Sequence, residues 1–497
     1  MGIKRYTAIA DNTITNQYSE ALQTRATTAN AGLADSMEIF KIYGQVTGTS
    51  IEQSRILIKF PVNETDLPSN IKTILQDRTA GILPASGSVK FVMKLSNVRH
   101  SDTVPRSFKL VAHPISQSWT EGLGIDMDNY SDTGKSNWLS ASTSAAWTTA
   151  GSDYLTNYAY EQTFDSGLED FEVDVSEYVE GVLKSDHALY NKNYGFAVIL
   201  SSSYLADANS YYTKKFSARS SEYFFNRPII EARWDSSTKD DRRNFYYSSS
   251  LAPEADNLNT IYLYNNIGGR LQNIPAVGTG KVYVQLYQSS ASAPSGTVLT
   301  PVEDGSHVLS TAPTVVTGGY VSTGVYSASV AMTGTADTLH DVWFSGSQQY
   351  MTGTLYPESR DLEQSTRTND YYVSLTNLKT IYSTTETARI RIYSRLKGWS
   401  PTIYTKAVSE PQLYIPTSGS YEIIRIIDNY KVVEHSTGSI KFTELSFDGS
   451  GSYFDFDMSM LEPGYSYGIK LAFYDDFISD YKPLQETFKF RVEKHET

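Results

Sequence analysis

The chain has 497 residues, of which 40% are hydrophobic and 20% are charged, and its formal net charge is -13. The composition excludes a disordered chain, and the absence of cysteine excludes disulfides, thiolate metal sites and thiol nucleophiles. The acidity and the lack of a Lys/Arg cluster argue against nucleic acid as a partner, and no run approaches the ~20 apolar residues of a membrane span.

Apolar and polar residues alternate along short segments of the first region, residues 1–235, as they do in half-buried strands. Val89–Leu95 is the clearest of these, because every second residue is apolar and two lysines lie opposite. The other strands expected here are Ser54–Phe60, Phe171–Val175, Phe196–Leu200 and Ile229–Trp234. Ser176 is the expected N-cap of a short helix that runs to about Lys184. This region predicts a jelly-roll-like β-sandwich.

Asp235–Arg243 is polar, charged and without periodicity, and it predicts a linker. The second region, residues 244–360, returns to alternation, with Gly- and Ser-rich turns between the segments. The strands expected in it are Ile261–Tyr264, Val282–Tyr287, Val321–Val330 and Val342–Phe344. Their size and spacing are typical of an immunoglobulin-like sandwich.

The third region, residues 370–497, predicts five or six strands, enough for a small immunoglobulin- or fibronectin-like sandwich. These strands are Tyr371–Leu375, Ala388–Tyr393, Tyr421–Ile427, Tyr453–Met458, Ser466–Tyr474 and Thr487–Val492. Arg389 and Arg391 are expected to share a solvent face, while Phe454 and Phe456 point inward. The expected fold class is therefore all-β, with two to three tandem β-sandwich domains. The 37 tyrosines suit it, since their rings pack on a sheet while their hydroxyls stay wet.

Trp119, Trp138 and Trp147 lie close together in the sequence among Ser, Thr, Asn and Gly, and they are the candidate ligand-binding residues. If they are exposed on a sandwich loop, their rings can stack on the apolar C–H faces of sugars. The alternative is a plug that covers an open end of the sandwich, with each indole N–H hydrogen-bonded. The sequence favours the plug and leaves sugar binding open.

The most oxygen-rich loop is 126–134, in which Asp126, Asp128 and Asp132 are candidate calcium ligands. The spacing departs from the EF-hand pattern, because Tyr130 occupies an expected ligand position and no Glu closes the loop. The alternative is Asx-turn chemistry in a surface loop. No other metal site and no cofactor is expected.

No motif supports catalysis. The seven histidines are scattered without the spacing of a zinc helix, and there is no glycine-rich phosphate loop and no Gly-x-Ser-x-Gly elbow. The acidic pairs are too common in an acidic chain to indicate a glycosidase. We expect a protein that is not an enzyme.

Several segments of the first region resemble the DNRLRE-type β-sandwich modules of bacterial surface proteins and phage structural proteins. The matching segments are Ser54–Phe60, Ser118–Gly122, Phe171–Val175, Asn193–Val198, Phe216–Arg219 and Arg227–Pro228. The resemblance covers roughly 200 residues in order. It implies an adhesive or structural module, and some such modules are called carbohydrate-binding.

The whole chain is similar to the large virion proteins of marine tailed phages. The segments that carry this resemblance are Met1–Ala8, Leu258–Tyr264, Trp399–Thr405 and Leu461–Lys470. It implies a structural protein of the virion, assembled in the host cytoplasm around the neck, tail or baseplate. Its partners would be other virion proteins and copies of itself in a symmetric assembly. The alternative function is a glycan-binding adhesin, receptor-binding or capsid decoration protein whose partner is a host-surface glycan.

Overall fold

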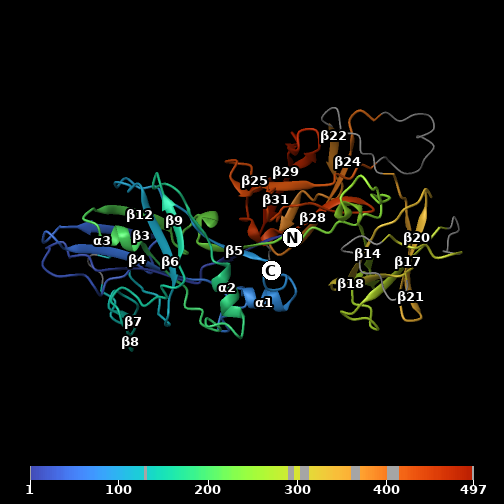
Figure 1. Cartoon of the computed structure of the whole chain (residues 1–497). Helices are drawn as coiled ribbons and strands as arrows, with labels where there is room; N and C mark the ends of the chain where they lie inside the picture. Colours follow the sequence, from blue (N-terminus) through green and yellow to red (C-terminus); the bar gives the residue numbers. More distant parts are fainter. Residues whose placement is uncertain are drawn as a thin grey trace. The chain divides into compact units, whose positions relative to one another are not determined.

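The computed structural model describes residues 2–127, 131–288, 296–302, 313–359, 370–399 and 413–494. The chain forms two compact units, Gly2–Trp234 and Asp235–Thr497, and each is considered by itself. Both consist mainly of strands, so the predicted all-β fold is confirmed (Figure 1). The longest described helix, α2 (Ser176–Leu183), has 8 residues, and no described helix is long and apolar enough to cross a bilayer.

The first unit is a sandwich of two antiparallel sheets. One sheet has four strands in the order β1 (Ile3–Thr7), β13 (Ile229–Arg233), β5 (Lys90–Leu95) and β10 (Phe171–Asp174). The other has the order β12 (Tyr211–Ser217), β3 (Ser36–Tyr43), β4 (Ile51–Lys59), β11 (Phe196–Leu200), β6 (Phe108–Pro114) and β9 (Tyr160–Phe164), with β2 (Ala10–Thr15) also along β4. Because β1 pairs with β13, the two ends of this unit lie side by side.

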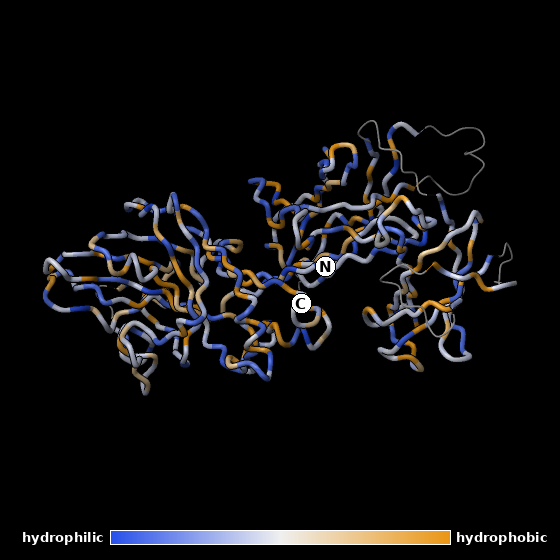
Figure 2. Tube along the Cα trace, in the orientation of Figure 1, coloured by the Kyte–Doolittle hydropathy of each residue, from blue (hydrophilic) through white to orange (hydrophobic). Residues whose placement is uncertain are grey.

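The core of this sandwich lies between the two sheets. Phe91, Met93 and Leu95 of β5 are fully buried and contribute to one cluster with Ile56 and Ile58 of β4. The inward face predicted for Val89–Leu95 is therefore confirmed. Figure 2 shows apolar and hydrophilic residues alternating along the strands, which is the pattern on which that prediction rests.

Short elements connect the strands of the first unit. They are α1 (Ile74–Thr79), β7 (Ser140–Ser142), β8 (Ala145–Ala146), α2, α3 (Ser202–Ala206) and the 3₁₀ turn η1 (Phe224–Asn226). The helix expected after β10 is present as α2, but the N-cap prediction is wrong: the N-cap is Val175, and Ser176 is the first helical residue. The Ser176 hydroxyl instead donates to Asp174 Oδ1 at 2.6 Å and accepts from the Phe91 N–H at 2.8 Å, which ties the helix to β5.

The second unit begins with a sandwich in which one strand belongs to both sheets. The strand order is β14 (Asn259–Tyr264), β19 (Val325–Val330), β18 (Val316–Ser322), β17 (Val282–Tyr287), β20 (Leu339–Ser345) and β21 (Gln348–Leu355). The first half of β18 pairs with β17 and its second half with β19. At this crossing a Cβ on Gly318 would lie 2.6 Å from the Ser327 carbonyl oxygen, so the close approach requires glycine.

The predicted strand Val321–Val330 is in fact the end of β18, a turn, and β19. The turn contains Gly324 at a φ of +73°, a backbone conformation that glycine adopts without strain. Smaller elements of this sandwich are η2 (Glu254–Asn257), β15 (Asn266–Ile267) and β16 (Arg270–Leu271). Ile261 and Leu263 of β14 share one buried cluster with Val284 of β17 and Trp343 of β20, so the alternation predicted for β14 is confirmed.

The last sandwich has the strand arrangement of an immunoglobulin fold. One sheet has the order β22 (Tyr371–Leu375), β24 (Thr387–Leu396), β28 (Gly451–Asp457) and β27 (Ser446–Asp448). The facing sheet has the order β23 (Ile381–Ser383), β31 (Phe488–Glu493), β29 (Ser466–Asp475), β25 (Gly419–Arg425) and β26 (Lys431–Val433), with β30 (Asp480–Pro483) also on β29 and η4 (Met458–Met460) after β28. In chain order these are the A-B-E-D and A′-G-F-C-C′ sheets of that fold.

Two further contacts are typical of this fold. The Tyr467 hydroxyl donates to the Glu462 carbonyl oxygen at 2.7 Å at the start of β29, which is the geometry of a tyrosine corner. Tyr421 of one sheet stacks on Phe454 of the other, with ring centroids 4.1 Å apart. The prediction of five or six strands is too low, because the sequence analysis misses strands of three or four residues such as β23 and β27.

Candidate functional site

The tryptophans singled out by the sequence lie on the outer face of the seven-stranded sheet of the first unit. Trp138 and Trp147 are 5% and 6% exposed and pack in a small apolar cluster with residues such as Leu57 and Ile199. The Trp147 indole N–H donates to the Asn137 carbonyl oxygen at 2.8 Å. This is the geometry of a packed cover, with almost none of either ring available to a sugar.

Trp119 is half-buried against the same cluster, and its indole N–H donates to the Tyr194 carbonyl oxygen at 2.8 Å. Below the cover, Arg55 is 8% exposed, and its Cζ lies 4.9 Å from the Trp138 ring centroid. Arg55 Nη1 donates to the Gly151 carbonyl oxygen at 2.7 Å, and burial lowers the pKa of the guanidinium. The ring face of Trp138 is thus in contact with the protein's own cation. Sugar binding by these tryptophans stays a prediction.

The candidate calcium ligands are only partly described. Asp128 lies outside the described residues, and Asp126 is exposed. Asp132 Oδ2 accepts hydrogen bonds from the Leu123 N–H at 2.9 Å and from Asn30 Nδ2 at 3.3 Å. Over the part of the chain that the structure describes, no group of three or more His, Cys, Asp or Glu side chains is placed to hold a metal ion. The calcium site stays a prediction, and the described contacts of Asp132 organise the loop.

The predicted linker Asp235–Arg243 is packed against both sandwiches of the second unit. Lys239 forms a parallel β-bridge with Phe447 of β27. The Phe447 N–H donates to the Thr238 carbonyl oxygen at 2.9 Å, and the Asp240 N–H donates to the Phe447 carbonyl oxygen at 3.1 Å. The segment therefore adds to the edge of the last sandwich. The linker interpretation is wrong, because polar residues without periodicity are also compatible with a short edge strand whose backbone is satisfied.

The same segment then joins the middle sandwich through a buried ion pair. Arg242 Nη1 and Nη2 lie 2.6 and 2.8 Å from the two carboxylate oxygens of Asp341, whose side chain is fully buried. Asp341 Oδ2 also accepts from the Trp343 indole N–H at 2.6 Å. A parallel bridge between Tyr246 and Glu358 continues the attachment. Residues 238–246 thus connect the two sandwiches through hydrogen bonds and charge.

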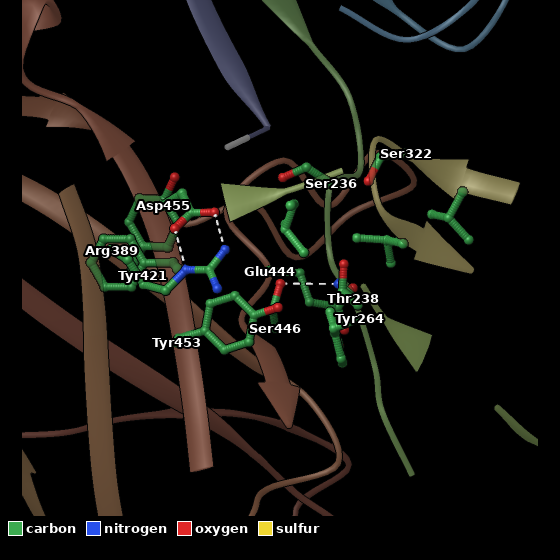
Figure 3. A pocket seen from close by; sticks show the side chains of 14 residues that line it. Ser236, Thr238, Tyr264, Ser322, Arg389, Tyr421, Glu444, Ser446, Tyr453 and Asp455 are labelled. Atoms are coloured by element: carbon green, nitrogen blue, oxygen red, sulfur yellow. Dashed lines mark hydrogen bonds and ion pairs between the residues drawn. The ribbon is translucent and has the colours of Figure 1, made fainter. Parts of the chain in front are cut away.

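Next to this segment lies a cavity of about 190 Å³, to which we refer as the junction cavity (Figure 3). The middle sandwich contributes Tyr264, Ser322 and Val325, and the last sandwich contributes Tyr421 and Tyr453, among others. The inner wall is deeply buried, since Tyr421 is 1% and Tyr453 5% exposed. On the middle sandwich, the lining residues Leu271 and Val321 are 40% and 48% exposed.

The charged groups of the junction cavity are paired within the protein. Arg389 Nε and Nη2 lie 2.8 and 3.0 Å from the two carboxylate oxygens of Asp455, as the dashed lines in Figure 3 show. Glu444, with a side chain only 2% exposed, accepts from Lys239 Nζ at 2.8 Å. The Arg389 Cζ lies 4.3 Å from the Tyr453 ring centroid. The cavity therefore carries polar character without an uncompensated charge.

Two tyrosine hydroxyls of the lining are unpaired. The hydroxyls of Tyr264 and Tyr421 are buried and make no hydrogen bond to any described residue. Burial raises the pKa of both, and the nearby carboxylates Asp240 and Asp455 respectively raise it further. Both hydroxyls therefore stay protonated at neutral pH, and neither has surface that a water molecule or a ligand in the cavity can reach. A buried hydroxyl without a partner costs about 1–3 kcal/mol, so both destabilise the fold.

Two carboxyls of the attached segment have strongly perturbed acidity. Burial raises the pKa of Asp240 to about 6, although Arg242 opposes this. Burial also raises the pKa of Asp241 to about 7, although the carboxylate accepts from the Thr260 N–H at 2.7 Å. These groups titrate near neutral pH and lie where the segment joins the two sandwiches.

Sequence reasoning misses the junction cavity as a site. The signals were present in part, since Arg389 and Arg391 were expected on one solvent face, and both lie over the Tyr453 ring. In β14 the alternation places Tyr262 and Tyr264 opposite the buried Ile261 and Leu263, and Tyr264 does line the cavity. Only the topology brings these strands together.

No protein-family model and no curated protein matches the chain. Among solved structures, the adhesin InvE of Yersinia pseudotuberculosis is similar at 11% identity and a TM-score of 0.15, over 47% of this chain and 54% of that one. The IG1 and IG2 domains of DIP-gamma align at 10% identity and a TM-score of 0.13, over 44% of this chain and 86% of that one. The tandem Ig repeats of Dlar align at 9% identity and a TM-score of 0.14, over 44% and 92%.

The chain thus spans about half the length of the InvE structure. At these TM-scores the similarities carry no argument about function, and the assignment to an all-β fold of sandwiches rests on the strand order itself.

Proposed function

We propose that the protein is a non-enzymatic structural component of a tailed bacteriophage particle, which assembles by protein–protein contacts around the neck, tail or baseplate. The resemblance to virion proteins of marine tailed phages supports this proposal. Its segments fall in both units, for example Gly2–Ala8 in the first and Leu461–Lys470 in the second. The partners are other virion proteins and further copies of this chain.

The observation that carries the proposal is the edge strand β21. Its eight residues, Gln348–Leu355, include no charged side chain. It ends the sheet of the middle sandwich, and within the described residues no strand pairs with its outer edge. Monomeric proteins commonly protect such edges with lysines, prolines or bulges, because an open edge adds a strand from another chain. The pairing of β21 with β20 has an irregularity between Trp343 and Phe344, but the edge carries no charge. An uncharged edge of this length suits a protein that is built into an assembly.

The direct test is cryo-microscopy of purified particles, with mass spectrometry for the copy number. We expect the chain at three-, six- or twelve-fold positions around the tail axis, or at five-fold positions at capsid vertices. Absence of the protein from mature particles would end the proposal.

A second test addresses β21 itself in the purified protein. Gln349 is exposed, so Gln349→Lys adds a charge to the edge without disturbing the core. Sedimentation velocity should show weaker self-association for this variant. Gln23→Lys, at an exposed loop position of the first unit, is the matched control and should leave the association unchanged. Equal association of both variants would argue against β21 as the contact.

A further inference from the structure

Lys214 of β12 is a buried lysine among aromatic rings in the first unit. It is 1% exposed, and its Nζ lies 5.1 Å from the Phe164 ring centroid and 4.9 Å from the Phe216 ring centroid. Burial lowers the pKa of Lys214 to about 8, although the charges of Asp170 and Glu169 oppose this. About a tenth of these side chains are therefore neutral amines at pH 7. Desolvation among apolar groups is one way in which proteins make a lysine nucleophilic.

The group that Lys214 contacts most closely is a side-chain amide. Its Nζ donates to Asn97 Oδ1 at 2.6 Å, and its other acceptors are the backbone carbonyl oxygens of Gly167 at 2.9 Å and Glu169 at 2.7 Å. Of these three amides, only that of Asn97 can lose its nitrogen without a break in the main chain. The hydrogen bond polarises the Asn97 carbonyl and holds Nζ close to Cγ, the carbon bonded to Oδ1.

Carboxylates are present beside this pair. Asp170 Oδ1 accepts from the Asn97 N–H at 2.7 Å, and the charges of Asp170 and Glu169 both act on Lys214. When an amine replaces the nitrogen of an amide, one proton must move from the amine to the leaving nitrogen. A carboxylate at the reacting pair is a group that accepts and returns such a proton. The nucleophile, the amide and the proton carrier are therefore together.

Lys41 of β3 shows a buried lysine without such a partner. Its side chain is fully buried, and its Nζ donates to the carbonyl oxygens of Tyr204 and Asp207 at 2.7 and 2.6 Å and to Asp207 Oδ1 at 2.9 Å. The negative charge of a carboxylate resists attack by an amine, and the two backbone amides cannot be replaced without breaking the chain. Lys41 is therefore a structural cation, and Lys214 differs from it in facing a primary amide.

We propose that Lys214 and Asn97 form an intramolecular isopeptide bond in the folded protein. The amine attacks Asn97 Cγ, the bond from Cγ to Nδ2 breaks, and this nitrogen leaves as ammonia with one proton from Lys214. The reaction consumes no oxidant, cofactor or water. Asn97 follows β5 of one sheet, and Lys214 lies in β12 of the other, so the bond joins the two sheets of a sandwich that has no disulfide. It is independent of a role in a particle.

Intact mass spectrometry of the purified full chain tests the proposal directly. The bonded chain is lighter than the open chain by the mass of one ammonia molecule, about 17 Da. Trypsin does not cleave after a lysine in an isopeptide bond, so tandem mass spectrometry should find residues 95–99 linked to residues 193–215. The mass of the open chain, with residues 95–99 recovered as a free peptide, would overturn the proposal.

Variants locate the bond. Lys214→Arg and Asn97→Ala each remove one reacting group, so neither should show the loss of mass. Lys215→Arg is the matched control at the next residue, because Lys215 Nζ pairs with Glu38 and Asp102 instead of an amide, and it should show the full loss. A loss of mass that persists in Lys214→Arg or Asn97→Ala would also overturn the proposal. The wild-type mass decides the question even where a variant fails to fold.

Discussion

The tryptophan cover of the first unit and the junction cavity of the second both collect aromatic rings around an arginine, yet they differ in hydrogen bonding. In the cover, the indole N–H groups of Trp119 and Trp147 donate to backbone carbonyls, and Arg55 lies against the Trp138 ring. In the cavity, the hydroxyls of Tyr264 and Tyr421 make no bond to a described residue. The cover also contains an unpaired group, since the buried Arg55 Nε makes no hydrogen bond to a described residue. Neither aromatic composition nor a buried polar group without a partner therefore identifies a binding site.

Buried carboxylates differ in how far nearby cations compensate their charge. In the first unit, burial favours a raised pKa for Glu231, but Arg5, Lys94 and Arg233 together lower it to about 2. In the second, Asp240 and Asp241 have few compensating cations, and burial raises their pKa values to about 6 and about 7. The difference lies between sites and not between the units, since burial also raises the pKa of Asp11 in the first unit to about 7, and Asp341 in the second unit is paired with Arg242.

Replacing a covered tryptophan should have the largest effect. Trp138→Ala should lower the stability of the first unit by about 3–5 kcal/mol, because the ring is buried and its loss leaves a cavity. Hydrogen exchange in denaturant reports residues 2–234 separately from the rest of the chain. Tyr223→Ala, at an exposed position, is the control and should change stability by less than about 0.5 kcal/mol. An equally small loss for Trp138→Ala would mean that the ring is not packed as described.

Breaking the ion pair that attaches residues 238–246 should be nearly as costly. Arg242→Met leaves the Asp341 carboxylate buried without its cation, and the middle sandwich should lose about 3–5 kcal/mol. The double variant Arg242→Met, Asp341→Leu removes the charge as well and should recover much of the loss. The same unfolding measurement on the second unit checks both. A single variant as stable as the wild type would show that the segment is a free linker after all.

The stability of the second unit should depend on pH through its two buried aspartates. Because the folded pKa values of Asp240 and Asp241 lie above the usual value near 3.8, their contribution is full below that value and is lost as the pH rises through about 6 to 7. The thermal midpoint of the second unit should therefore decrease as the pH is raised from 5 to 8, because the stabilisation from these two protonated carboxyls is lost.

The double variant Asp240→Asn, Asp241→Asn isolates the contribution of the two aspartates. The difference in thermal midpoint between this variant and the wild type should grow from pH 5 to 8. His435, whose pKa burial lowers, contributes equally to the pH curves of both proteins. Glu231 has the opposite sign, since its stabilising effect is present above the usual value near 4.5 and is lost as the pH falls toward 2. Parallel curves for wild type and variant would contradict the burial of the two aspartates.

The smallest loss of stability is expected from the unpaired hydroxyl. Tyr421→Phe removes a buried group that has no partner among the described residues, so stability should not fall and should rise by up to about 1–3 kcal/mol. Tyr467→Phe is the matched comparison, because its hydroxyl donates to the Glu462 carbonyl oxygen and its removal should cost about 1–3 kcal/mol. Equal losses for the two variants would show that the Tyr421 hydroxyl is satisfied within the protein.

The fold class was accessible from the sequence because period-two patterns depend only on local burial. Phe91, Met93 and Leu95 face the core for that reason. Local patterns fail to predict the role of a residue where that role depends on a contact with a distant segment of the chain. Ser176 bonds to Phe91 on another strand, and Lys239 pairs with Phe447 more than 200 residues away. Neither partner can be inferred from spacing.

The junction cavity shows the same limit for function. Its lining comes from strands that are distant in the sequence, such as β14, β25 and β28. The local pattern of each strand predicts only which side chains face the solvent and which face the core. The tyrosine corner in Leu461–Tyr467 could have been predicted from the sequence, because a Tyr soon after a Pro-Gly turn at the start of a strand is a sign of this motif.

Hydrogen–deuterium exchange of the full chain tests the packing of the tryptophan cover and of the segment beside the junction cavity most directly. We expect slow exchange at the Trp147 and Asp240 N–H groups, which donate to the Leu139 and Phe447 carbonyl oxygens. Exchange at both positions as fast as in an unstructured peptide would contradict this packing.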